Sequence, residues 1–158
     1  MTEKRIGVLT QMSCGGLFNI KLYNIFVTDN RLIFSFMSKE AKKETQKRLD
    51  EKVKGKSFKE RLSIIASHGY VLPEHYHEMA IDDIANEHPN NIVVLLDDVV
   101  KISIKRPKTP DSKGYSKSDY FILKTKDKKI KITPASKEDM KLFNTVLKER
   151  AKIPRIIL

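Results

Sequence analysis

The stretch Leu22–Met37 reads Leu-Tyr-Asn-Ile-Phe-Val-Thr-Asp-Asn-Arg-Leu-Ile-Phe-Ser-Phe-Met, and it decides the fold. Residues that favour strands, β-branched and aromatic, fill both of its halves. The halves meet at Asp29-Asn30, a pair that favours turns because both side chains bond to nearby backbone and both tolerate a positive φ. The stretch therefore predicts a β-hairpin.

Five further strands are predicted from period-two alternation or from apolar runs bounded by turn residues. In chain order they are Lys4–Met12, Ile92–Leu96, Val99–Lys105, Tyr120–Thr125 and Lys129–Thr133. In the third of them, Val100, Ile102 and Ile104 are expected on one side and the lysines on the other. The last two form a second hairpin, so the chain is predicted to be mainly β.

The segment Ser38–Pro89 has the patterning of helices. Ser38–Lys54 is rich in helix formers and highly charged, with a thin apolar stripe. A capping box at Ser57–Glu60 starts a second helix, whose apolar face is expected to pack against a third helix over Glu74–Asn86. A last amphipathic helix is predicted over Ser136–Ala151.

The first hairpin and a later strand resemble the prokaryotic PH-like and GRAM-type families. Tyr23–Phe34 is similar to their hydrophobic-x-Val-Thr-(Asn/Asp)-x-Arg-Leu-Ile hairpin, and Leu95–Ile102 is similar to their next strand, without its proline. The resemblance covers Met1–Met37 and Asn90–Ala151. It implies an α+β, mainly β fold, a PH-like small barrel of two antiparallel sheets capped by a C-terminal helix. Residues 1–158 would form a single PH-like domain, with 38–89 as a helical insertion between barrel strands.

The resemblance also implies a non-enzymatic scaffold that binds lipid head groups, peptides or other subunits. PH domains that bind phosphoinositides use basic residues in the loop between their first two strands. The corresponding loop here, Met12–Asn19, has no lysine or arginine. This departure argues against specific inositol-phosphate recognition at that loop.

Length and composition fit one domain with a core, since 158 residues include 40% hydrophobic residues, although there is no tryptophan. No apolar run reaches the roughly 18 residues of a transmembrane helix, and no signal peptide is expected. The single cysteine, Cys14, rules out an internal disulfide and fits a reducing compartment. A cytoplasmic location is therefore expected.

The net charge of +11 is unevenly distributed along the chain. Glu74–Val100 carries −7, whereas Lys101–Thr133 carries +8. Lysines alternate with apolar residues on the predicted strands, so they should project from the outer side of a sheet. The candidate ligand-binding residues of this basic face are Lys101, Lys105, Arg106, Lys124, Lys129 and Lys131. Such a face attracts an anionic membrane surface or a nucleic-acid backbone. A merely solvated surface is the competing interpretation.

The sequence predicts no catalytic residue, metal or cofactor. All four histidines fall within His68–His88 among acidic residues, but their spacing matches no zinc motif. Cys14 lies beside Gly15-Gly16, and no sequence cue pairs its thiol with a base. A metal-dependent enzyme is therefore the weakest of three hypotheses, behind a binding module and a nucleic-acid-binding protein.

Self-association is expected because the chain ends in Ile156-Ile157-Leu158 and a PH-like barrel keeps edge strands. In the competing interpretation, this tail folds back on its own barrel. The favoured function is a PH-like binding or assembly module with a protein partner or itself as a homo-oligomer, and with an anionic membrane surface as a further contact. The alternative is a nucleic-acid-binding protein that uses the basic face of strands 101–131.

Overall fold

The computed structural model describes residues 3–15, 19–67, 72–105 and 119–134, together with residues 141, 145, 156 and 157. The strands are β1 (Arg5–Cys14), β2 (Lys21–Thr28), β3 (Arg31–Phe36), β4 (Ile92–Leu95), β5 (Val99–Lys105), β6 (Tyr120–Thr125), β7 (Lys129–Thr133) and β8 (Ile156–Ile157). The helices are α1 (Lys39–Val53), α2 (Phe58–Ser67), α3 (His75–Glu78) and α4 (Ile81–Asn86), and a 3-10 turn, η1 (Leu96–Asp98), follows β4.

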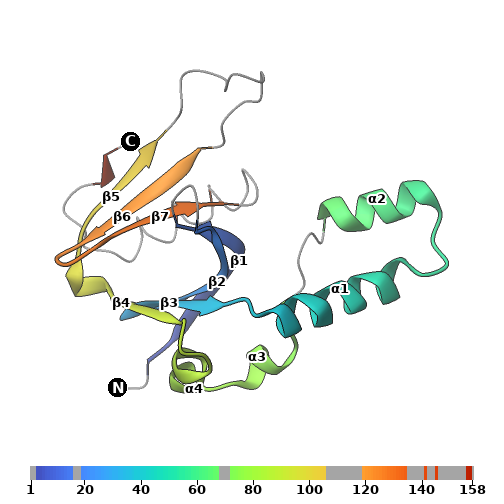
Figure 1. The fold of residues 1–158 in the computed structure, drawn as a ribbon, viewed down its shortest axis with the longest axis horizontal. Coiled ribbons are helices and arrows are strands. Elements are labelled where there is room, and N and C mark those ends of the chain that lie inside the picture. The colour runs from blue at the N-terminus through green and yellow to red at the C-terminus, as the bar shows by residue number, and fades with distance from the viewer. Residues whose placement is uncertain are drawn as a thin grey trace.

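The strands form one sheet in the order β4-β3-β2-β1-β7-β6-β5-β8 (Figure 1). Neighbours from β4 to β5 are antiparallel, and β8 runs parallel to β5. The prediction of two sheets is corrected here, because β1 joins both halves by pairing with β2 and, through Ser13 and Cys14, with β7. A register shift before Met12 bends β1. At this point Gln11 has a φ of 54°, and its N–H is bonded to Oδ1 of Asn24.

The predicted first hairpin is confirmed, with β2 and β3 paired in the register Val27 to Leu32. Thr28, which was not predicted to take part in the turn, holds it in place. Its Oγ1 accepts hydrogen bonds from the N–H groups of Asn30 and Arg31. Alternate side chains of the hairpin point to opposite faces. Ile25 lies in the main core, whereas Phe26 lies on the outer face.

The sheet curls around one apolar core to which both halves contribute. Its fully buried members include Leu9, Ile25, Phe34, Ile102, Phe121 and Ile132. The predicted inward face of β6 and β7 is confirmed, since Phe121, Leu123, Ile130 and Ile132 are all buried. On β5 the prediction is wrong for Val100. A register shift between Val99 and Lys101 buries Val99 and leaves Val100 exposed.

A second apolar cluster fixes α3 and α4 on the outer face of β2 and β3, and it contains Phe26, Ile33, Tyr76 and Ile84. The predicted single helix Glu74–Asn86 is therefore two short helices, separated by extended backbone at Met79 and Ala80. Arg5 explains the break. Its guanidinium donates to the carbonyl oxygens of Tyr76 (2.7 Å) and Met79 (2.9 Å), which holds the Met79 carbonyl away from a continuous helix.

Replacing Tyr76 with phenylalanine should lower the free energy of unfolding by about 1–3 kcal/mol. The buried hydroxyl of Ser35 would lose its partner and keep its cost of desolvation. The Tyr76 hydroxyl donates to Oε2 of Glu87 at 2.6 Å and lies 3.1 Å from Oγ of the buried Ser35. Urea denaturation would measure the change. Tyr120→Phe, at a half-buried tyrosine of β6, is the control and should have little effect; equal losses in both variants would contradict the assigned role of Tyr76.

Helices α1 and α2 extend from the barrel as an arm (Figure 1). The N–H of Ala41 is bonded to Oγ of Ser38, which caps α1, and α2 runs back alongside α1. The predicted packing of the apolar face of α2 against the third helix is not observed for Phe58 and Leu62, the members of that face whose side chains the structure describes. Phe58 and Leu62 are instead 78% and 51% exposed, and α3 and α4 pack on the barrel.

The two ends of the sheet differ. At one end Ile156 and Ile157 pair with Ile102 and Ser103 of β5, so these two residues of the tail lie on their own barrel, as in the competing interpretation. The predicted capping helix over 136–151 lies outside the described residues, except that Lys141 and Thr145 are helical and exposed.

Candidate functional site

Three of the predicted basic residues form a row across the sheet. Lys101 of β5 is directly opposite Lys124 of β6, which is directly opposite Lys129 of β7. Lys101 is half-buried, whereas Lys105, Lys124, Lys129 and Lys131 are exposed. Arg106, the sixth predicted residue, lies outside the described residues. Alternation along each strand places these lysines on the outer face, since Ile102, Leu123 and Ile130 beside them are buried, and the strand register brings them opposite one another.

Other charges around the basic face are partly engaged. The ammonium of Lys131 lies 4.2 Å from the ring centroid of Tyr120 in a cation–π contact. Lys126, at the end of β6, pairs with Asp98 at 2.7 Å. That hydrogen bond raises the pKa of Lys126. For Lys101, Lys124 and Lys129, no ion pair is found within the described part of the chain.

The second candidate surface is the outer edge of β4. Within residues 3–15, 19–67, 72–105 and 119–134, no strand pairs with β4 on the side away from β3. The side chains of Val93 and Leu95 are 39% and 51% exposed, while Val94 is buried in the core. The apolar run Ile92–Leu96 predicts a strand, which is observed as β4. Its position at an edge was not predicted, because the position of a strand within a sheet is not encoded in its own apolar run.

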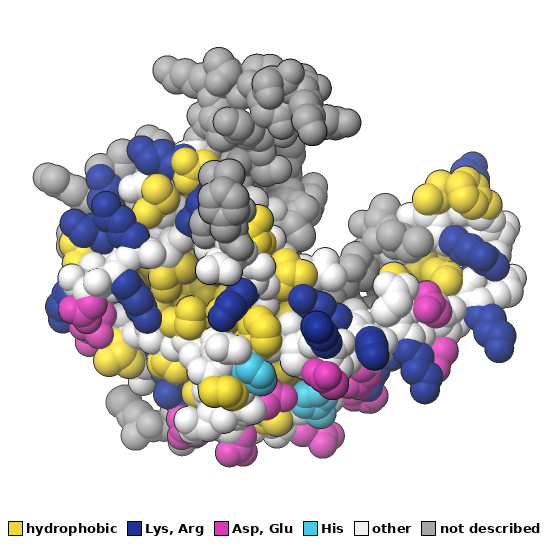
Figure 2. All heavy atoms as spheres, in the orientation of Figure 1, with side chains coloured by type: hydrophobic (Ala, Val, Ile, Leu, Met, Phe, Trp, Pro, Cys, Tyr) yellow, Lys and Arg dark blue, Asp and Glu magenta, His cyan; other side chains and the backbone are white. Residues whose placement is uncertain are grey.

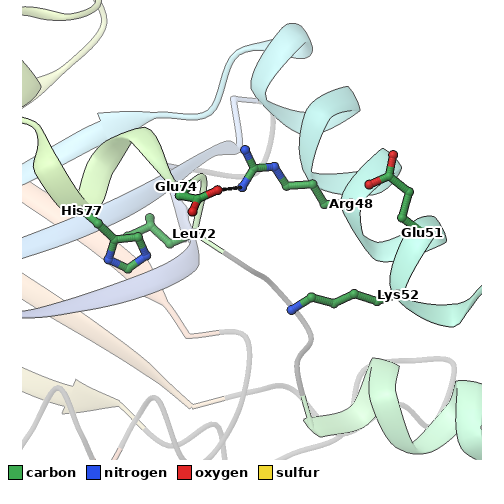
Figure 3. Close-up of a pocket in the computed structure, with 6 residues that line it drawn as sticks. All are labelled: Arg48, Glu51, Lys52, Leu72, Glu74 and His77. Carbon is green, nitrogen blue, oxygen red and sulfur yellow. Dashed lines mark ion pairs between the residues drawn. The ribbon is translucent and has the colours of Figure 1, made fainter.

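A polar cleft of about 700 Å³ separates α1 from α3 (Figure 3). Arg48 points from α1 toward Glu74, with 3.9 Å between the charged groups, and Lys52 points into the gap between the helices. The remaining lining residues are Glu51, Leu72 and His77. Basic and acidic side chains both line this open cleft, and the charges of Arg48 and Glu74 offset each other. The lining therefore does not point to a ligand of one charge.

The chemistry proposed for a metal enzyme or a thiol nucleophile gains no support. No group of three or more His, Cys, Asp or Glu side chains among the described residues is placed to hold a metal ion. Cys14 is buried, and burial raises its pKa to about 12. The thiolate, which is the nucleophilic form, is therefore scarce at neutral pH.

Comparison with known proteins gives limited similarity. No protein-family model and no curated protein matches the sequence. Among solved structures, the chain is similar to "Vps36 N-terminal PH domain", with a TM-score of 0.48 and 13% identity over 95% of this chain and 80% of that chain. The strand order described above shows a mainly β fold, a single curled sheet whose neighbours from β4 to β5 are antiparallel. None of the described helices is long and apolar enough to span a membrane.

Proposed function

We propose that this chain is a non-enzymatic PH-like binding and assembly module whose β4 edge pairs with a second copy of itself. The observation that carries the proposal is that β4 is an edge of the sheet among the described residues, with Val93 and Leu95 exposed on it. At the opposite end of the sheet, β8 pairs with β5, so the tail is already in contact with its own chain. We therefore assign self-association to β4 and not to the tail.

The backbone of β4 has hydrogen-bonding groups that point outward. The N–H of Leu96 donates to the carbonyl of Asn30 at 2.8 Å, so Leu96 faces β3. Backbone groups of successive strand residues point to opposite sides, and Val93 and Leu95 therefore direct their N–H and C=O groups away from β3. Such a row of unpaired groups is a template for another strand.

β4 is short, with four residues, but three other usual protections of an edge strand are missing from it: a charge, a proline and a bulge. Ile92–Leu96 contains no charge and no proline, and its register with β3 is regular from Ile92 to Leu95. An uncharged β-branched edge favours pairing with a similar strand. A second copy of β4 supplies such a strand, because its own Val93 and Leu95 are equally exposed and apolar.

Two-fold symmetry gives this pairing a defined register. An antiparallel pair centred on Val94 places Val93 of one copy opposite Leu95 of the other, and each such pair exchanges two backbone hydrogen bonds. Four hydrogen bonds then join the copies. The four side chains of Val93 and Leu95 would form one apolar patch on the outer face, and the interface would be isologous and closed.

The test is the mass of the full chain in solution. Light scattering at several concentrations should show dimers that dissociate on dilution, whereas Leu95→Lys and Val93→Lys should be monomers, because two-fold symmetry brings the new charges together at the interface. Ile20→Lys is the matched control. Ile20 is 65% exposed but lies outside β4, so its variant should remain dimeric.

Amide hydrogen exchange gives an independent readout of the register. The N–H groups of Val93 and Leu95 should become protected as concentration rises, while the N–H of Val94 should be protected throughout. A monomeric wild type at high micromolar concentration would refute self-pairing. So would dimers that survive both lysine substitutions.

Nucleic-acid binding is the second candidate function, favoured by the row of Lys101, Lys124 and Lys129. Like charges directly opposite each other destabilise a sheet, and no described carboxylate pairs with these three. Phosphates of a nucleic-acid backbone would neutralise the row by releasing counterions. Among the residues that the structure describes, no exposed aromatic side chain lies between the lysines of the row, which favours backbone contact over base stacking.

Lys124→Gln should weaken binding to a duplex DNA and lower the slope of log affinity against log salt by about one. The substitution removes the central charge of the row, which has a lysine on both sides. Fluorescence anisotropy at several salt concentrations would measure this change. Lys128→Gln removes an exposed charge in the turn after β6 and should leave the slope unchanged. Identical slopes for Lys124→Gln and wild type would exclude the row as the contact.

A further inference from the structure

The outer end of the arm exposes apolar side chains. Figure 2 shows hydrophobic side chains there among lysine and arginine side chains. Phe58 and Leu62 are four residues apart on α2 and therefore lie on the same side of the helix. Their exposure is costly in water and is unusual for an aromatic and an aliphatic residue side by side.

The charges around this apolar pair have mainly one sign. The arm tip, defined as Lys54–Leu62, carries four basic residues and one acidic residue. These are Lys54, Lys56, Lys59, Arg61 and Glu60. All five are exposed. Glu60 accepts hydrogen bonds from Ser57 within the capping box, so the acidic charge serves the helix cap and the basic charges remain directed to solvent.

Local bonds hold the arm tip in this arrangement. Gly55 provides the turn with a φ of 73°, in the left-handed region that favours glycine, and nothing lies within 4 Å of a Cβ built there. Arg61 Nε donates to the carbonyl of Lys56 at 2.9 Å, and the capping box starts α2 at Phe58. The aromatic ring is thus presented by a formed helix at the far end of the arm (Figure 1).

We propose that the arm tip inserts into the surface of an anionic lipid bilayer. Basic residues near a membrane are attracted to anionic head groups. An amphipathic helix then gains by burying aromatic and aliphatic side chains at the boundary of the acyl chains. The arm tip has both features, and its distance from the barrel lets it reach a membrane ahead of the acidic surface of α3 and α4. This contact does not depend on pairing through β4.

Leu62 favours lipid over nucleic acid as the ligand. Phe58 alone can stack on a base, but an aliphatic side chain gains little from stacking. Hydrocarbon accommodates both residues, and the pair lies on one side of α2. The charge complementarity of the arm tip therefore selects an anionic surface, and its apolar pair selects a lipid one.

The chain contains no tryptophan, so Phe58→Trp creates a single fluorescent reporter at the proposed contact. The full chain with this substitution would be mixed with phosphatidylcholine vesicles, with or without phosphatidylserine. Tryptophan emission should move to shorter wavelength only with phosphatidylserine. In vesicle flotation, the variant Phe58→Ala/Leu62→Ala should bind phosphatidylserine-containing vesicles roughly tenfold or more weakly than the unsubstituted chain.

Controls separate the arm from the rest of the molecule. Ile20→Ala truncates an apolar residue whose exposure, 65%, lies between those of Leu62 and Phe58, and it should bind vesicles normally. Leu95→Lys, which tests self-pairing, should also bind vesicles normally. Lys56→Glu/Lys59→Glu should abolish binding by reversing the charge of the tip. Unchanged emission with anionic vesicles would overturn the proposal. So would equal flotation of wild type and Phe58→Ala/Leu62→Ala, or an emission shift with duplex DNA alone.

Discussion

Phe34→Ala should lower the free energy of unfolding by about 3–5 kcal/mol, the cost expected when a fully buried phenylalanine leaves a cavity. Phe34 has no exposed surface and lies in the main core, and its ring packs edge-on against Tyr23 with 6.1 Å between ring centroids. Because domains of this size have a total stability of about 5–15 kcal/mol, this one change would remove a large part of it. Urea denaturation followed by circular dichroism would measure the change.

Phe58→Ala provides the matched control, since the same atoms are removed from a side chain that is already in water. Its effect should stay within about 0.5 kcal/mol of wild type. The comparison tests the assignment of the two phenylalanines in one experiment. A Phe34→Ala variant less than about 1 kcal/mol below wild type would place Phe34 outside the core.

Local features of the fold were predictable from the sequence. Both hairpins connect neighbouring segments, so turn residues and alternation within a few residues suffice to predict them. The same alternation identifies Phe121 and Leu123 as inward-facing and Lys124 as outward-facing, as the structure confirms. The capping box at Ser57 and Glu60 was predictable for the same reason.

Features that depend on distant parts of the chain were not predictable. The break between α3 and α4 depends on Arg5, more than seventy residues earlier in the chain. The exposure of Val100 depends on a bulge that shifts β5 by one residue against β6. A strand register also decides the lysine row, because the sequence identifies which lysines face outward but not which ones stand opposite each other.

The two surfaces missed by the sequence analysis share a cause. Ile92–Leu96 has the composition of a central strand, and only the sheet order makes it an edge. Phe58 and Leu62 have helical spacing, which is the same for a buried face and for an exposed one. The spacing of apolar residues predicts whether a segment is a helix or a strand, whereas the elements packed against it decide which of its faces is exposed to solvent. Two features of the sequence could have indicated these surfaces: the absence of charge from Ile92–Leu96, and the lysines that surround Phe58.

The thiol of Cys14 should react with Ellman's reagent far more slowly in the native chain than in denaturant. Burial raises its pKa from 9.0 to about 12, so the native thiolate at pH 8 is reduced by roughly a thousandfold relative to the unfolded chain. Only the thiolate attacks the reagent. Absorbance at pH 8, with and without urea, would measure the two rates. Comparable rates would show that Cys14 is accessible and would restore it as a candidate nucleophile.

The same pKa shift makes stability depend on pH in a defined direction. Because the native thiol holds its proton more tightly than the unfolded one, its contribution is fully present below pH 9 and is lost as pH rises toward 12. Between pH 9 and 10.5, the free energy of unfolding of wild type should therefore fall relative to that of Cys14→Ala by up to about 1.4 kcal/mol per pH unit. Lysines and tyrosines titrate in both proteins, so the difference between the two curves isolates Cys14. Parallel curves would mean that the folded protein does not hold this proton, and the thiol would then lie in water rather than at the junction of β1 and β7.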